Sequence, residues 1–124
     1  MIKVVHFDYV PFFSGGLRER LEFEFAKHPD VRYIDYGKEF RSASFTWSRE
    51  HLESMLPDAD VLLIHPGLKN QKAVFEYPKR FPDLRVALVT PEGCEYKESA
   101  DFGISLFSYN HIDQIVKFVL RGKK

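Results

Sequence analysis

Short apolar runs alternate with amphipathic segments along the chain. The apolar runs are rich in Val, Ile and Leu and predict five β-strands, at about residues 2–8, 31–36, 60–65, 85–90 and 103–108. The segments between them carry apolar residues at helical spacing. In the first of these, Leu17, Leu21 and Phe25 fall four residues apart on one helix face. This alternation indicates a mainly parallel sheet that is covered by helices on both faces.

The predicted helices have recognisable ends. They cover about residues 17–28, 49–56, 68–80, 95–100 and 112–121, of which 95–100 is short and weakly patterned. Pro29 and Pro57 end the first two helices, Ser48 is a candidate N-cap, and Gly122 is placed to cap the last helix. With right-handed crossovers, the units predict a three-layer α/β fold in one domain, residues 1–124, a doubly wound parallel five-stranded sheet of order 2-1-3-4-5.

Composition narrows the classes of partner and compartment. A chain of 124 residues can bury a core without disulfides or a structural metal, and Cys94 is its single cysteine. Eighteen basic residues balance eighteen acidic ones, so net charge favours neither nucleic acid nor an anionic membrane. No segment approaches the roughly 20 apolar residues that span a bilayer. We therefore expect a cytoplasmic protein with no nucleic-acid or membrane partner.

Polar side chains stand at the ends of several predicted strands. Asp8 ends the first strand, His65 the third and Thr90 the fourth, while Tyr109 follows the fifth. In an open α/β sheet, ligands and functional groups collect at the carboxyl ends of the strands. These four residues are therefore the candidate strand-tip site, although no catalytic motif accompanies them and the catalytic residues, if any, stay unknown.

With its units in this order, the chain resembles a response-regulator receiver domain over nearly its whole length. The resemblance lies in size, element order and the polar strand tips. Receivers carry acidic residues after the first strand, a phospho-accepting Asp at the end of the third and Ser or Thr at the end of the fourth. Here Asp8 matches one acidic position and Thr90 the hydroxyl position. The resemblance implies a flavodoxin-like topology and a role in signalling.

Other positions depart from the receiver pattern. The run D-V-L-L-I-H places His65 at the acceptor position, Phe7 occupies the second acidic position, and Tyr109-Asn110 stands where Lys-Pro is expected. An acyl phosphate needs a carboxylate nucleophile, and its Mg²⁺ needs hard oxygen ligands. We therefore expect a non-enzymatic receiver-like module for signalling or protein interaction, with no cofactor, which binds a protein partner or self-associates. The alternative is a small-ligand-binding protein or enzyme that uses the edge around Asp8, His65 and Thr90.

Three further hypotheses concern ligands at this edge. His6, Asp8 and His65 could form a metal or acid–base cluster, but no metal-ligand spacing supports it, so we predict no metal site. The run Ser14, Gly15 and Gly16 opens the first helix, where free N–H groups bind anions and Arg18 or Arg20 could add charge. Because the run lacks a phosphate-loop pattern, plain helix capping is the favoured interpretation. Flavin is a further possibility, with Tyr9, Phe12, Phe13 or Tyr109 available for stacking.

The loop after the second strand carries aromatic residues. Phe40, Phe45 and Trp47 lie among polar and basic residues in GKEFRSASFTW, residues 37–47. Exposed aromatics beside Arg are typical anchors of protein interfaces. We interpret the loop as the candidate partner contact; an equally weighted alternative is that its aromatic side chains fold back over the sheet edge.

Overall fold

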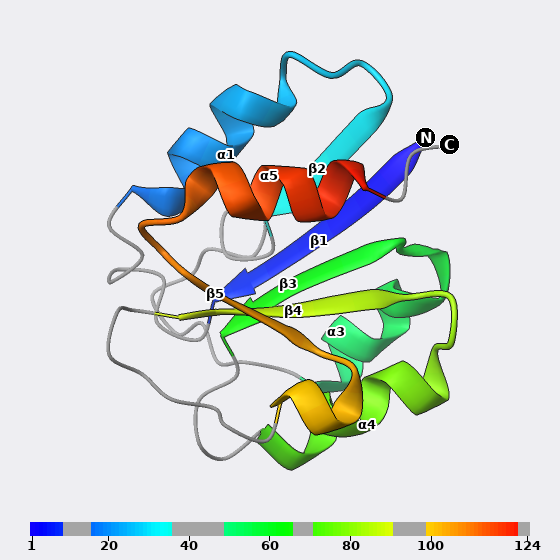
Figure 1. The fold of residues 1–124 in the computed structure, drawn as a ribbon. Coiled ribbons are helices and arrows are strands. Elements are labelled where there is room, and N and C mark those ends of the chain that lie inside the picture. Colours follow the sequence, from blue (N-terminus) through cyan, green and yellow to red (C-terminus); the bar gives the residue numbers. More distant parts are fainter. Residues whose placement is uncertain (9–15, 36–48, 66–70, 91–98, 122–124) are drawn as a thin grey trace, which may run out of the picture.

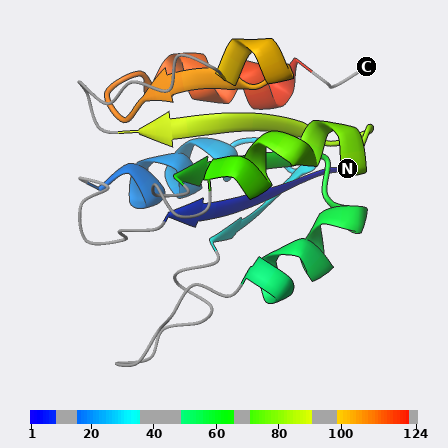
Figure 2. The ribbon, with the colours of Figure 1, turned by 90° about the horizontal axis from the view of Figure 1, so that it is seen from below.

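A computed structural model of the chain describes residues 1–8, 16–35, 49–65, 71–90 and 99–121. Its strands form one parallel sheet in the order β2-β1-β3-β4-β5, and all the arrowheads point the same way (Figure 2). The strands are β1 (Ile2–Asp8), β2 (Val31–Asp35), β3 (Val61–His65), β4 (Arg85–Thr90) and β5 (Ser105–Ser108). The predicted α/β class, the flavodoxin-like topology and the strand order are confirmed.

Two helical layers cover the sheet (Figure 1). Helices α1 (Leu17–Phe25) and α5 (Ile112–Leu120) pack on one face. Helices α3 (Arg49–Met55) and α4 (Gln71–Arg80) pack on the other, together with the short 3-10 turns η2 (Leu56–Asp58) and η4 (Ser99–Phe102). Each layer follows from a helical stripe of apolar residues that requires a hydrophobic surface to cover.

The end of α1 differs from the predicted one. Helix α1 stops at Phe25 instead of near His28, because the chain enters tight turns before Pro29, in which Lys27 N donates to Glu24 O and His28 N donates to Phe25 O. Most of the predicted helix near 95–100 lies outside the described residues, and its described end belongs to the 3-10 turn η4 at Ser99–Phe102. The predicted caps Ser48 and Gly122 lie outside the described residues.

The strands divide the core into two clusters. Along β3, Val61 and Leu63 join the cluster under α1 and α5, whereas Leu62 and Ile64 join the one under α3 and α4. All four side chains are fully buried, as expected for the central strand of a doubly covered parallel sheet. This alternation also decides which face of the sheet each residue at a strand tip occupies.

Arg85 of β4 forms hydrogen bonds with the carboxyl end of α5. Its Nη2 donates a 2.8 Å hydrogen bond to the carbonyl of Val119, and its Nη1 donates to that of Phe118. Helix carboxyl ends carry unsatisfied carbonyls and a partial negative charge, so a guanidinium is a favourable partner there. The contact holds α5 in place beside α1.

Candidate functional site

The strand-tip edge brings His65 and Tyr109 together. Their ring centroids are 6.4 Å apart, with the ring planes tilted by 51°. The backbone N–H of Tyr109 donates a 2.9 Å hydrogen bond to the carbonyl of Thr90, which holds the end of β5 against β4. On the other side, the β1–β3 register pairs Asp8 with His65. The four predicted residues therefore share one edge of the sheet.

Thr90 and His65 share this edge but lie on opposite faces of the sheet. Thr90 is two residues beyond Leu88, which packs under α3 and α4, whereas His65 is two residues beyond Leu63, which packs under α1 and α5. Thr90 is also only 2% exposed, while His65 is half-buried.

A buried polar cluster lies between α1, β1 and β2, one step below the edge. The Nδ1 of His6 lies 2.5 Å from the hydroxyl of Tyr33, and Nη1 of Arg18 donates a 3.3 Å hydrogen bond to Oδ1 of Asp35. The β1–β2 register pairs His6 with Asp35. His6, Arg18 and Asp35 are all at least nine-tenths buried, so the cluster belongs to the interior.

Burial makes His6 a poor acid–base group. Loss of hydration lowers its pKa from 6.5 to about 3, and the positive charge of Arg18 contributes to the same shift. His6 is therefore neutral near pH 7 and fixed by Tyr33. In the described part of the chain, no three His, Cys, Asp or Glu side chains lie close enough to hold a metal ion.

The predicted anion site is described only in part. Gly16 has a left-handed φ of 79° and caps α1 without a side-chain hydrogen bond, which explains why glycine suits this position. Arg18, proposed to add charge there, is buried against Asp35 instead. Ser14 and Gly15 lie outside the described residues, as do the predicted partner contacts Phe40, Phe45 and Trp47.

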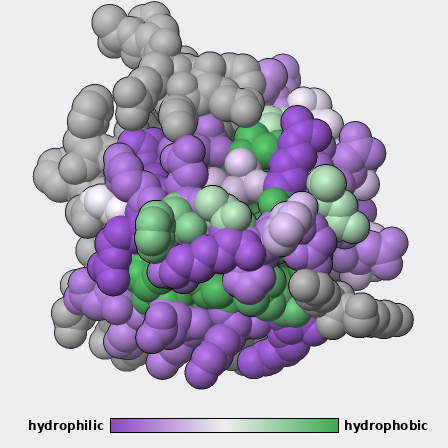
Figure 3. Space-filling view, turned by 90° about the horizontal axis from the view of Figure 1, so that it is seen from above, coloured by the Kyte–Doolittle hydropathy of each residue, from purple (hydrophilic) through white to green (hydrophobic). Residues whose placement is uncertain are grey.

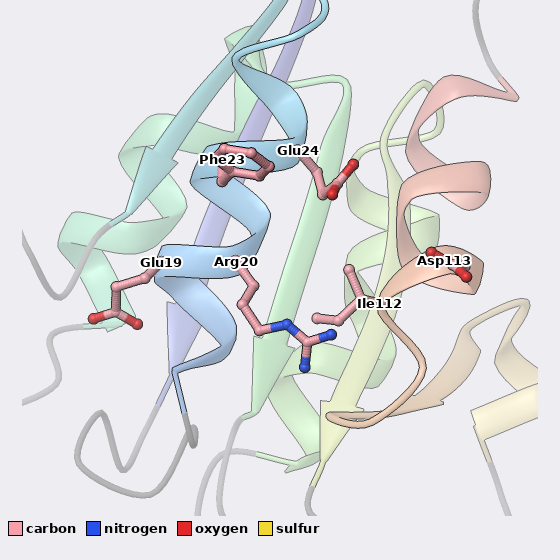
Figure 4. A pocket seen from close by; sticks show the side chains of 6 residues that line it. All are labelled: Glu19, Arg20, Phe23, Glu24, Ile112 and Asp113. Carbon is pink, nitrogen blue, oxygen red and sulfur yellow. The ribbon is translucent and has the colours of Figure 1, made fainter.

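A groove between α1 and α5 is a feature that the sequence did not indicate. It encloses about 410 Å³ (Figure 4), and its lining residues are Glu19, Arg20, Phe23, Glu24, Ile112 and Asp113. Phe23 is 66% exposed although it is a large apolar side chain, and Nζ of Lys27 lies 4.7 Å from its ring centroid. Figure 3 shows the molecule from above relative to the view of Figure 1. On this side, a band of hydrophobic residues is bordered by hydrophilic ones.

In comparisons with known proteins, no family model, curated protein or solved structure matches the chain. Within the described ranges, no helix is both long and apolar enough to cross a bilayer. A proposal for function therefore depends on the arrangement of the residues themselves.

Proposed function

We propose that the chain is a non-enzymatic, receiver-like protein-interaction module for signalling, which lacks a phospho-accepting aspartate and contacts its partner through the α1–α5 groove. The observation that carries the proposal is Phe23, 66% exposed in that groove. An aromatic ring loses a large unfavourable contact with water when a partner covers it. Aromatic anchors in hollows are the usual energetic centres of protein interfaces.

The strand-tip edge supports a role without phosphotransfer. His65 occupies the end of β3, where the receiver resemblance implies a carboxylate, and its ring packs against Tyr109. An imidazole cannot form the acyl phosphate on which receiver signalling depends. Thr90, the matching hydroxyl, is buried on the other face. The proposed module therefore acts through binding, not through a phosphorylation switch.

A second candidate is a small-ligand-binding protein or enzyme at the strand-tip edge. The half-buried ring pair of His65 and Tyr109 favours it, because these side chains present a polar, aromatic surface at the place where α/β sheets bind ligands. On this hypothesis, His65→Ala weakens the binding or turnover of a defined ligand. Full activity in that variant would exclude it.

The proposed contact surface can be tested by photo-crosslinking in cells that normally express the chain. Benzoylphenylalanine at position 23 is expected to give a discrete crosslinked species, which mass spectrometry identifies. With the purified chain and that partner, Phe23→Ala should then weaken the binding of the partner by about fivefold or more, as for an aromatic anchor of an interface. Isothermal titration calorimetry measures the change.

Leu106 provides the matched control. It is also an exposed large apolar residue, 40% exposed, but it lies on the edge strand β5. Benzoylphenylalanine at position 106 should not give the same species, and Leu106→Ala should leave the affinity unchanged. Equal crosslinking from both positions, or a complex that is insensitive to Phe23→Ala, would refute the proposed surface.

A further inference from the structure

We infer that the α1–α5 groove receives a cationic, amphipathic helix of a partner protein. The inference rests on the proposed function and names the chemistry of its partner. Three kinds of observation support it: the charge of the lining, the placement of the apolar side chains and the arrangement of the two helices.

The lining of the groove is net negative in a chain whose overall charge is zero. Among the described residues of the lining, Glu19, Glu24 and Asp113 contribute three carboxylates, and Arg20 contributes one guanidinium. Lys27 lies 3.3 Å from Glu24 and 4.7 Å from the ring centroid of Phe23, so it offsets one of these carboxylates, and the surface counted with Lys27 keeps one net negative charge. A partner helix with Lys or Arg on its flanks complements this lining.

The charged and apolar groups are placed to contact one helix together. Arg20 and Glu24 of α1 extend toward α5, where Ile112 and Asp113 line the other side of the groove (Figure 4). Phe23 provides the exposed apolar surface. A partner residue such as Leu or Phe can therefore cover Phe23 while neighbouring cationic residues reach the carboxylates.

The size and shape of the groove fit a helix. The groove runs between two helices of one layer, and an amphipathic helix characteristically lays its apolar side chains into such a depression. Its volume of about 410 Å³ accommodates a few side chains, enough for the anchors of one helix face. A much larger ligand is not required to fill it.

A second copy of this chain is a poorer occupant. In a twofold dimer through this surface, the same patch appears on both subunits. Each net negative lining would then face its own copy, and like charges across an interface oppose association. A cationic helix avoids this repulsion.

Two synthetic peptides of identical apolar pattern test the inference, one with Lys and the other with Glu at all polar positions. Amide NMR follows Arg20, Phe23, Glu24, Ile112 and Asp113 in the whole chain. The Lys peptide should give saturable shifts at these residues, and the Glu peptide should not. Glu24→Gln with Asp113→Asn should weaken binding of the Lys peptide by about three- to tenfold.

A variant of equal charge change provides the control. Glu76 and Asp83 are exposed carboxylates on and next to α4, in the opposite layer, so Glu76→Gln with Asp83→Asn should leave the affinity unchanged. Equal weakening by both double variants, or equal groove shifts with the Glu peptide, overturns the cationic partner. Neither result contradicts the proposed function, which is tested separately by crosslinking from position 23 and by the sensitivity of that complex to Phe23→Ala.

Discussion

Replacing Arg18 with methionine is expected to lower the free energy of unfolding by about 3–5 kcal/mol, the usual cost of removing one partner from a buried ion pair. The side chains of Arg18 and Asp35 are only 10% and 8% exposed, and the guanidinium lies 3.3 Å from the carboxylate. Methionine keeps much of the apolar stem but leaves the carboxylate buried without this cation. Urea unfolding followed by far-UV circular dichroism measures the loss.

The matching double variant separates the charge from the packing. Arg18→Met with Asp35→Leu removes both charges, and replacing a whole buried pair by apolar residues is often close to neutral. The double variant should therefore recover most of the stability that the single one loses. A single variant as stable as the wild type, or a double variant no better than Arg18→Met, would show that the pair does not hold α1 against β2.

The second large effect is a loss of stability in acid that originates at His6. Its pKa is about 3 in the folded chain and 6.5 in the unfolded one. Between these values the unfolded chain binds the proton more readily, so stability falls as the pH decreases. The slope attributable to this one group is about 1 kcal/mol per pH unit. The slope is half developed at pH 6.5, where half of the unfolded chains carry the proton, and it vanishes below about pH 3, where the folded form also takes up the proton.

His6→Asn is the control for this effect, because an amide can replace Nδ1 beside the Tyr33 hydroxyl but does not titrate. The free energy of unfolding is measured with urea at several pH values between 6.5 and 5. Most carboxyl groups titrate below this range and therefore contribute little to the slope. The wild type should lose stability over this range, while the slope of the variant should be clearly smaller. Parallel slopes for the two proteins would contradict the assignment to His6.

The fold was accessible from sequence because its signals are local. Each apolar run corresponds to a strand, and the spacing of Leu17, Leu21 and Phe25 correctly predicts the buried stripe of α1. The end of that helix was harder to predict, since turns within residues 25–31 compete with one more helical turn before Pro29. Propensity does not decide between such closely balanced alternatives.

The face of the sheet on which each polar strand-tip residue lies depends on the register between neighbouring strands. The sequence pattern does not determine this register. The β3–β4 register pairs Leu63 with Ala87, so His65 and Thr90 are one residue out of phase and lie on opposite faces. The pairing of Arg18 with Asp35 likewise connects two segments through tertiary packing. One local signal was present: Arg18 precedes Leu21 by three residues and therefore lies near the buried stripe.

The sequence contains an even weaker indication of the groove between α1 and α5 than of the Arg18–Asp35 pair. Phe23 falls off the stripe of Leu17, Leu21 and Phe25, so an exposed position could have been predicted. That α5 lies beside it, and leaves a hollow lined by Ile112 and Asp113, follows only from the order of the sheet and the packing of both helices on one face.

The proposed module binds a protein and does not bind a small ligand at its strand tips. An amide NMR titration of the whole chain with Mg²⁺, Zn²⁺, acetyl phosphate, nucleotides and flavin distinguishes these two modes of action. The signals to follow are those of Asp8, Gly15, His65 and Thr90. No saturable shifts are expected at these residues with any of the compounds. Saturable shifts confined to this edge would contradict this expectation and would identify the class of ligand.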